Sequence, residues 1–428
     1  MDLRPFRGWR YQAGPAGEIS SRIAPPYDVL APEDKQELLA RDDHNIVAVD
    51  LPVCPPTGEG DDAAYAQAAE TLRRWQGEGA MQQDERPALY VYEQEYSWAG
   101  KTYVRRSLLA GVRATELGED VIPHEHTFAG PKADRLKLTQ HTGMQISPIF
   151  GFYNDPQGQV ESLLAEAVGG KPHAEASING VRERLWVIDD AGMITTLSSL
   201  LGPEKVFIAD GHHRYTTAMN YARQRRENGE IDSEHPGNFV MFALVARSDP
   251  GLLVLPTHRV VSGLDSSFAV PKLKAQATEF QWQRCSVAEA GLRDADAFLK
   301  RYGPGAMALI DADPAEIWIA RLTDPEAMKA VAADQSEAWR QLDVAVLHKL
   351  MIDTHLAEWR TDELFIEYTP DGNKALAACR SGRAQLAVCM RGTPIEAVEQ
   401  IARQGGCMPH KSTYFYPKLS TGMVLKEV

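Results

Sequence analysis

The sequence is poor in the features that mark secreted, membrane-bound and zinc-cluster proteins. It has five cysteines and no C-x-x-C pair, so neither a disulfide framework nor a sequence-local zinc site is predicted. No run approaches the roughly eighteen apolar residues of a membrane helix. The arginine-rich start MDLRPFRGWR is not followed by the apolar stretch of a signal peptide. We therefore expect a soluble, cytoplasmic protein without a membrane partner.

Positive charge is scarce as well. The 428 residues carry 45 Lys and Arg against 59 Asp and Glu, which gives a formal net charge of −14. Binding to a nucleic acid would need a basic face to displace counterions, and no basic run is long enough to form one. The chain also lacks the G-x-x-x-x-G-K-[ST] motif of Walker ATPases and the G-x-S-x-G motif of α/β-hydrolases. Nucleic-acid binding and these two enzyme classes are therefore disfavoured.

The pattern that is present belongs to the α+β class. An acidic first turn predicts a helix over 32–41, and apolar residues at helical spacing predict a second helix over 63–75. Apolar and alternating runs over 88–98 and 102–114, joined by Ala99-Gly100, predict a β-hairpin. Strands and helices mix in this way through the first part of the chain, which predicts a mixed sheet.

The length of the chain suggests two or three domains. The runs 238–248 and 251–261 are joined by a turn signal and predict a second hairpin. A new alternation begins near residue 266 and includes a long helix over 336–359. We predict an α+β part over 1–265 and a C-terminal α/β domain over 266–428.

The most informative segment reads VFIADGHHRYTT, residues 206–217. A short apolar strand ends at Asp210, a glycine allows a tight turn, and a helix then opens with two histidines and an arginine. The unpaired N–H groups of a helix N-terminus favour an anion, and a guanidinium can hold two phosphate oxygens. The alternative is an ordinary strand–turn–helix connection in which Asp210 supplies the counter-charge. The candidate phosphate-binding residues are Gly211, His212, His213 and Arg214.

A second polar segment, HEHTFAGPKADR, covers residues 124–135. Its density of imidazole, carboxylate and cationic groups suits acid–base chemistry and the holding of an anionic substrate. The alternative is a solvated loop with local ion pairs. The four histidines of the two segments could also bind a transition metal, but the spacing is not H-E-x-x-H and we rank this interpretation lower. The candidates here are His124, Glu125, His126, Lys132 and Arg135.

Three further segments carry weaker signals. The prolines of APPYDV would present Asp28 on a rigid, extended approach, although a plain turn explains the residue equally well. The segments 257–259 and 410–418 contain histidine, arginine and lysine. Either segment could complete a pocket, and either could lie on the surface.

Several long motifs resemble one family in the order in which they occur. They are PFRGWR, APPYDV, HEHT with PKADRLKL and SPIFGFY, VFIADGHHRY, LPTHRVV and MPHKSTYFYPKLSTG. This series resembles the bacterial and archaeal family named domain of unknown function 1015 (DUF1015). The resemblance spans nearly the whole chain.

The segment IADGHHR alone is similar to the phosphate-binding box of the ParB N-terminal domain, sulfiredoxin and the free-serine kinases. The resemblance implies a ParB/sulfiredoxin-like N-terminal part and ATP, ADP or CTP as ligand, with residues 211–214 as the phosphate box. His212 stands where sulfiredoxin has a cysteine, so reduction of sulfinic acids is not expected. The helix-turn-helix of ParB has no counterpart in this sequence.

The leading hypothesis is a nucleotide-dependent phosphotransferase, using ATP or ADP, that acts on a small polar metabolite such as a hydroxy amino acid. Arg214 would neutralise the transferred charge, and Glu125 or Asp28 would accept the proton of the substrate hydroxyl. Mg²⁺ is expected because it bridges phosphate oxygens in such reactions. The other predicted roles are catalytic for His126 and Asp210 and substrate-binding for His124, Lys132 and Arg135. The alternatives are a nucleotide-sensing protein without turnover and a metal-dependent hydrolase.

Overall fold

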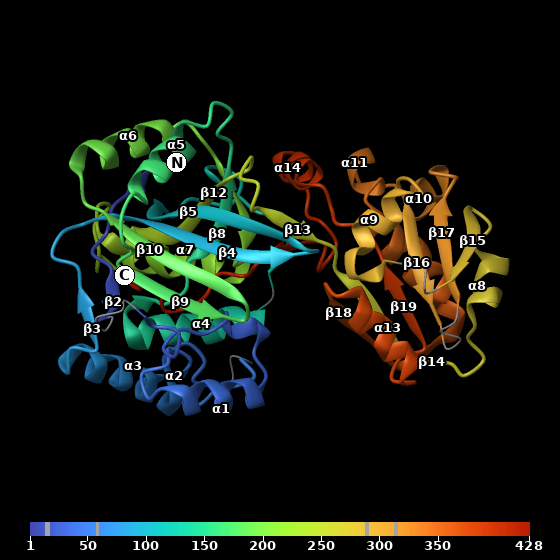
Figure 1. Ribbon diagram of the computed structural model, residues 1–428, viewed down its shortest axis with the longest axis horizontal. Helices are drawn as coiled ribbons and strands as arrows, with labels where there is room; N and C mark the ends of the chain where they lie inside the picture. The colour runs from blue at the N-terminus through green and yellow to red at the C-terminus, as the bar shows by residue number, and fades with distance from the viewer. Residues whose placement is uncertain (13–17, 57–59, 128, 287–290, 312–315) are drawn as a thin grey trace. The chain divides into compact units, whose positions relative to one another are not determined.

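The computed structural model of the chain describes residues 1–12, 18–56, 60–127, 129–286, 291–311 and 316–428 (Figure 1). It divides into two compact units. Unit 1 comprises Met1–Leu252 together with Pro417–Val428, and unit 2 comprises Leu253–Tyr416. The sequence predicts a boundary at residue 265, and that prediction does not include the return of the last residues to the first unit.

Unit 1 is built on a nine-stranded sheet in which β6 and β11, and likewise β8 and β12, run parallel while the other neighbours are antiparallel. The predicted α+β class with a mixed sheet is thus confirmed. The strands in spatial order are β6 (Val121–Ile122), β11 (Val206–Asp210), β8 (Ile149–Tyr153), β12 (Phe239–Ala246), β5 (Lys101–Arg113), β4 (Leu89–Trp98), β10 (Val181–Ile188) and β9 (Ala174–Ile178), with β1 (Leu3–Arg4) paired to β5.

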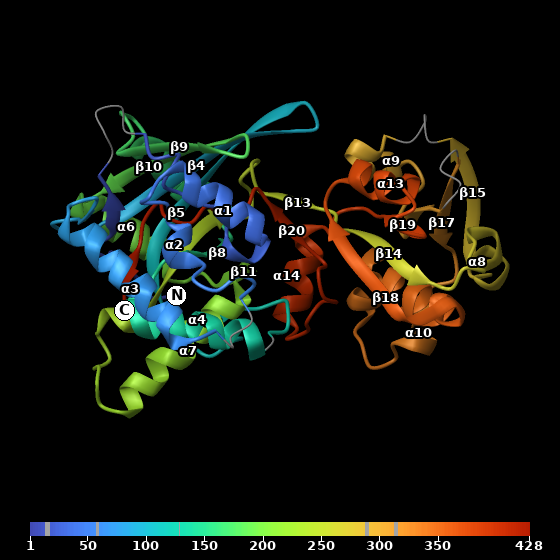
Figure 2. The ribbon, with the colours of Figure 1, turned by 90° about the horizontal axis from the view of Figure 1, so that it is seen from below.

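Helices cover this sheet. Figure 1 shows α5 (Gln159–Ala167) and α6 (Ala191–Leu201) above the sheet and α3 (Asp62–Gly77) below it. The helices α3, α4 (Ala129–Thr142) and α7 (His212–Glu227) pack side by side (Figure 2). Unit 1 also contains α1 (Pro32–Arg41), α2 (Val47–Asp50), the 3-10 turns Tyr27–Val29 and Pro236–Asn238, and the strand pairs β2 (Trp9–Tyr11) with β3 (Met81–Gln83) and β7 (Met144–Gln145) with β21 (Lys426–Glu427).

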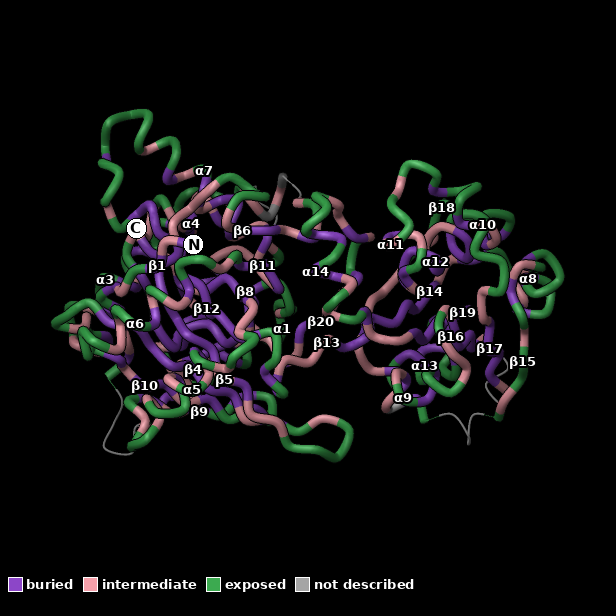
Figure 3. Tube along the Cα trace, turned by 90° about the horizontal axis from the view of Figure 1, so that it is seen from above, coloured by how far each residue is buried: buried purple, intermediate pink, exposed green. Residues whose placement is uncertain are grey.

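The apolar sequence of the central strands explains the core of unit 1. Every residue of β12, FVMFALVA, is buried, as expected for a strand that has neighbours on both edges and is covered on both faces. Figure 3 shows buried chain running through the strands of this unit. Alternate residues of β12, from Val240 to Ala246, pack in one cluster with residues of α5, α6 and α7.

Local predictions in unit 1 are confirmed. Helix α1 spans the predicted residues 32–41, α3 contains the predicted range 63–75, and β4 and β5 form the predicted hairpin. The second predicted hairpin is wrong, because β12 pairs with β5 and β8 while β13 (Leu253–Leu255) pairs with β20 (Tyr414–Tyr416). A fully apolar strand is stabilised best between two other strands, and this preference outweighs the adjacent turn signal.

Unit 2 contains an antiparallel six-stranded sheet. Its strands in spatial order are β15 (Phe280–Ser286), β17 (Glu316–Leu322), β16 (Ala306–Ile310), β19 (Leu386–Cys389), β14 (His258–Leu264) and β18 (Arg360–Thr369). Its helices are α8 (Val270–Gln276), α9 (Ala295–Lys300), α10 (Glu326–Val331), α11 (Glu337–Arg340), α12 (Asp343–Val346), α13 (Gly372–Arg380) and α14 (Ile395–Arg403), with a 3-10 turn at Leu292–Asp294.

The prediction of one long helix over 336–359 is wrong, because the segment is interrupted and forms several shorter helices. After α11 the backbone of Leu342 is extended, and α12 is followed by a π-helical stretch over Leu347–Thr354 and a 3-10 turn over His355–Trp359. The carboxylate of Asp343 receives two hydrogen bonds from Arg391 and one from the backbone N–H of Gly305. These tertiary bonds fix the chain at the interruption and override the helical pattern.

No helix among the described residues combines the length and the apolar character that crossing a bilayer would require.

Candidate functional site

The turn between β11 and α7 has the predicted strand–turn–helix form. Gly211 adopts φ +96°, a conformation that residues with a side chain rarely adopt. A Cβ atom at this position would lie 3.0 Å from Nη2 of Arg214, because the arginine folds back over the glycine. Gly211 therefore serves both the backbone turn and the placement of the guanidinium.

Asp210 lies between two cations at this turn. Arg214 Nη2 donates to its Oδ2 atom at 2.7 Å, and Lys418 Nζ donates to its Oδ1 atom at 2.5 Å. Burial alone would raise the pKa of Asp210, but Lys418 and Arg214 together hold it well below its ordinary value. All three side chains stay partly accessible, with exposed fractions of 19% for Asp210, 13% for Arg214 and 17% for Lys418.

The Arg214 guanidinium has a second protein partner. Its Nη1 atom donates to the backbone carbonyl of Pro148 at 2.6 Å, so protein groups contact the guanidinium on two sides. A cavity of about 40 Å³ reaches Arg214 and is lined by Asp50, Arg135 and Ser147 as well. This volume is sufficient for ordered water but not for a nucleotide.

His124 and His212 join the two polar segments. The backbone N–H of His124 donates to Nε2 of His212 at 3.2 Å, and the two rings meet edge to face at 4.6 Å. Both side chains are buried, and burial lowers the pKa of His124 to about 4 and that of His212 well below its usual value. Both imidazoles are therefore neutral at pH 7, and His212 carries its proton on Nδ1 because Nε2 is the acceptor.

Arg135 is buried in an ion-pair cluster. Its Nη1 donates to Asp50 at 3.0 Å, its Nε donates to Asp134 at 2.7 Å, and its guanidinium lies 3.9 Å from the ring centroid of Tyr27. Burial would lower the pKa of Arg135, but Asp50 and Asp134 raise it above its ordinary value. Arg135 therefore holds α4 against the segment that precedes Asp28.

The other predicted residues lie nearer to solvent. Asp28, in the 3-10 turn next to Tyr27, and His126 are exposed, and within the described part of the chain neither side chain forms a hydrogen bond or ion pair. Glu125, Lys132 and His213 are partly exposed. The hydroxyl of Thr217 on α7 donates to the carbonyl oxygen of Lys132 at 3.4 Å, which places the start of α4 beside α7.

The residues 417–421 bring a group to the site that the sequence did not identify. Lys418 comes from the segment 410–418, for which the sequence predicts only that it could complete a pocket or lie on the surface. The backbone of residues 417 and 418 is held by two hydrogen bonds. Arg105 donates to the carbonyl oxygen of Pro417 at 2.7 Å, and Gln94 donates to the carbonyl oxygen of Lys418 at 3.1 Å. Ser420 donates to buried Glu183 at 2.7 Å.

The segment that contains Asp28 is hydrogen-bonded to residues 417–421 as well. Ala24 and Thr421 exchange two backbone hydrogen bonds of 2.8 and 3.1 Å, and the hydroxyls of Thr421 and Ser147 lie 2.9 Å apart. Four sequence-distant motifs thus meet in unit 1: APPYDV, HEHT with PKADR, GHHR and KLST. The motif THR, residues 257–259, lies instead in unit 2, where buried Arg259 contacts His348.

Among the described residues, no group of three or more His, Cys, Asp or Glu side chains is arranged to hold a metal ion. His124 and His212 are close to each other and buried, whereas His126 is exposed.

Comparison with known proteins gives one family and several distant structures. No curated protein matched the chain. Among solved structures, a conserved hypothetical protein from Pyrococcus furiosus is 14% identical with a TM-score of 0.34, covering 75% of this chain and 95% of that chain. A free serine kinase variant in complex with ADP is 12% identical with a TM-score of 0.35, covering 74% and 92%. C-terminally truncated SbnI from Staphylococcus aureus is 11% identical with a TM-score of 0.33, covering 73% and 85%.

The family model described as "Protein of unknown function (DUF1015)" matches residues 3–345, which include three of the four motifs that meet in unit 1. This chain belongs to the DUF1015 family.

Proposed function

We propose that unit 1 binds the phosphates of ATP or ADP at the β11–α7 turn and transfers a phosphoryl group to the hydroxyl of a small polar metabolite, such as a hydroxy amino acid. The observation that supports this proposal most directly is the sharing of one carboxylate, Asp210, by two cations at the N-terminus of a 16-residue helix.

The charges at the turn favour an anion. Lys418 and Arg214 carry two positive charges against the single negative charge of Asp210, and the helix N-terminus adds a partial positive charge. An incoming phosphate replaces Asp210 on Arg214 and binds both cations, the guanidinium through two oxygens and the ammonium as a point charge. The partial exposure of all three side chains gives the phosphate access to them.

The buried residues have a positioning role in this proposal. His124, His212 and Arg135 are fixed by protein partners, so they hold the HEHT segment and α4 in place and do not contact the nucleotide. Glu125 and Asp28 are the more exposed carboxylates of the converging segments and are the candidates for the general base. His126, Lys132 and His213 are the accessible groups for orienting the substrate.

In the transfer step, the substrate hydroxyl oxygen bonds to the terminal phosphorus while the bond from that phosphorus to the bridging oxygen breaks. The hydroxyl proton passes to the carboxylate base, and the shortened nucleotide leaves. Lys418 and Arg214 stabilise the negative charge on the phosphoryl oxygens. The only described carboxylate on the turn, Asp210, is paired with two cations and does not form a Mg²⁺ site, so Mg²⁺ in this proposal arrives on the nucleotide and no step depends on a protein-held ion.

Titration calorimetry with ATP, ADP and CTP tests the binding site. We expect Arg214→Ala and Lys418→Ala to weaken binding by about 10- to 100-fold, the contribution of a charge-assisted hydrogen bond. Arg223→Ala is the matched control, because Arg223 lies on the same helix with its side chain 46% exposed and pairs with Glu116. Absence of nucleotide binding in the wild type, or equal binding by all four proteins, would contradict the proposal.

Mass spectrometry with hydroxy amino acids and nucleotide then separates catalysis from sensing. Phosphorylated product supports the transferase. Saturable nucleotide binding without any product would instead support the nucleotide-sensing alternative.

A further inference from the structure

Unit 1 contains a second cavity, of about 380 Å³, that shares no lining residue with the β11–α7 turn. It lies among β1, the strand residue Gly111 of β5, the start of β12 and the final strand β21. Its size falls within the range of small-molecule sites. The apolar part of its wall consists of Pro5, Phe6, Pro87, Pro236 and Phe239.

A buried lysine lines this cavity. Lys426 is 2% exposed, and its Nζ atom donates to the carbonyl oxygens of Pro236 at 2.7 Å and Glu427 at 2.9 Å. An ammonium has three N–H donors, so these two bonds leave one. Within the described part of the chain, Lys426 forms no ion pair with a carboxylate. A buried charge without a counter-ion is costly, and a bound anion would remove that cost.

A glycine of β5 lies beside both Phe239 and Lys426. Gly111 lies inside β5, where glycine weakens a strand unless another group must approach closely. A Cβ atom at position 111 would lie 3.1 Å from Cβ of Phe239 and 3.5 Å from Cε of Lys426. The glycine thus allows the close approach of Phe239, and the lysine stem lies at ordinary contact distance beside it.

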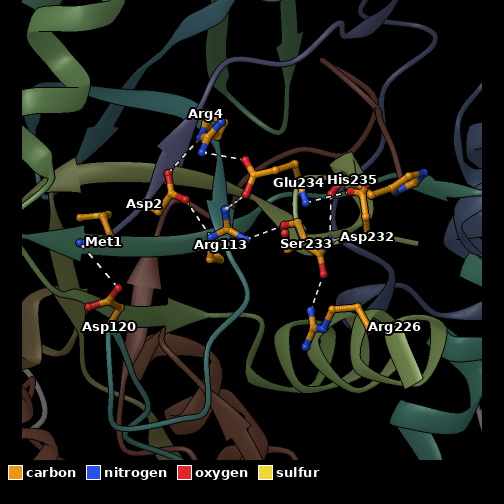
Figure 4. Close-up of polar contacts among 11 residues, drawn as sticks. Met1, Asp2, Arg4, Arg113, Asp120, Arg226, Asp232, Ser233, Glu234 and His235 are labelled. Carbon is orange, nitrogen blue, oxygen red and sulfur yellow. Dashed lines mark hydrogen bonds and ion pairs between the residues drawn. The ribbon is translucent and has the colours of Figure 1, made fainter. Parts of the chain in front are cut away.

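Two arginines near the cavity, Arg4 and Arg113, are paired with carboxylates, as Figure 4 shows. Arg7, which also lines the cavity, is exposed and donates to the backbone carbonyl oxygen of Asp84 at 2.8 Å. Arg4 pairs with Asp2 at 3.0 Å and with Glu234 at 3.1 Å, and Arg113 pairs with the same two carboxylates at 2.7 and 3.2 Å. Both guanidinium groups lie over the ring of Phe239, at 5.3 and 4.6 Å from its centroid. This closed ring of two cations and two anions fixes the Phe239 wall and leaves Lys426 as the buried cation without a carboxylate.

We propose that this cavity binds a small organic carboxylate, whose apolar body packs against Phe6 and Phe239 and whose carboxylate accepts a hydrogen bond from Lys426. Burial lowers the pKa of Lys426 to about 7, and the neighbouring carboxylate of Glu427, which also lines the cavity, offsets only part of this effect. The site is independent of the nucleotide site, so each can be tested without the other.

The experiment compares 4-phenylbutyrate with its neutral amide, 4-phenylbutyramide, by titration calorimetry and ligand-observed NMR on the full chain. We expect the wild type to bind the carboxylate at least about tenfold more tightly than the amide, the contribution of one charge-assisted hydrogen bond. We expect Lys426→Met to lose this preference and to retain the wild-type affinity for nucleotide.

Lys418→Met is the control variant, and it should keep the full preference for the carboxylate. Equal binding of acid and amide by the wild type, no binding of either at about 10 mM, or an unchanged preference in Lys426→Met would each overturn the proposal. The comparison of the two ligands on the wild type does not depend on how well any variant folds.

Discussion

At the scale of single residues, the burial of Lys426 makes the free energy of unfolding depend on pH. The folded protein holds its pKa near 7, whereas an exposed lysine has a pKa of about 10.4. Between these two values the unfolded chain binds more protons at this residue than the folded chain does. The contribution of Lys426 to the free energy of unfolding therefore rises with pH across this window and is constant below about pH 7.

Urea denaturation of the wild type and Lys426→Met between pH 6 and pH 10 measures this contribution. We expect the free energy of unfolding of the wild type, relative to that of the variant, to increase by up to about 1.4 kcal/mol for each pH unit above pH 7. The comparison cancels the titration of other lysines and tyrosines, which both proteins share. Curves that stay parallel from pH 6 to pH 10 would show that Lys426 titrates normally in the folded state.

At the scale of elements, the β11–α7 turn depends on Gly211. Gly211→Ala places a side chain at φ +96° and 3.0 Å from Nη2 of Arg214, so both the backbone and the arginine are strained. Gly229→Ala is the matched control, since Gly229 follows the same helix at φ +73° with nothing within 4 Å of the added Cβ atom.

We expect Gly229→Ala to cost about 1 kcal/mol of unfolding free energy, the price of the backbone conformation alone, and Gly211→Ala to cost about 1–2 kcal/mol more. Only Gly211→Ala should also weaken nucleotide binding, because it displaces the Arg214 guanidinium. Denaturation curves and calorimetry measure the two effects, and equal results for both variants would show that the packing of Arg214 on Gly211 is unimportant.

Elements of this kind are the part of the fold that the sequence predicts well. Helix α1 and the β11–α7 turn depend on residues within a few positions of each other, and both are confirmed. The interruption before α12 and the partners of β12 depend on distant residues, such as Arg391 for Asp343. Local periodicity contains no information about these partners, which is why both predictions were wrong.

At the scale of the molecule, the candidate site joins segments that the sequence keeps far apart. Asp210 and Lys418 are separated by 208 positions, and their ion pair forms because residues 417–428 belong to unit 1. The motifs could be identified individually from the sequence. The convergence of APPYDV, HEHT, GHHR and KLST required the structure, as did the burial that makes His124 and His212 neutral.

This arrangement predicts what removal of residues 417–428 does. Arg105 and Glu183 are fully buried, and the deletion takes away the carbonyl oxygen of Pro417 and the hydroxyl of Ser420 that they bind. Each buried polar group left without a partner costs about 1–3 kcal/mol. Since the deleted residues also contribute the Lys418 partner of Asp210, the loss of stability should reach the β11–α7 turn.

Hydrogen exchange followed by mass spectrometry can locate this loss along the chain. In a protein ending at Tyr416, we expect the amides of β4, β5, β10 and α7 to lose protection, because these elements share the unit to which residues 417–428 belong. The strands β14, β16 and β19 of unit 2 serve as the internal control and should keep the protection that they have in the full chain. An equal loss in both units would mean that they unfold together, and no loss in unit 1 would mean that the buried groups find other partners.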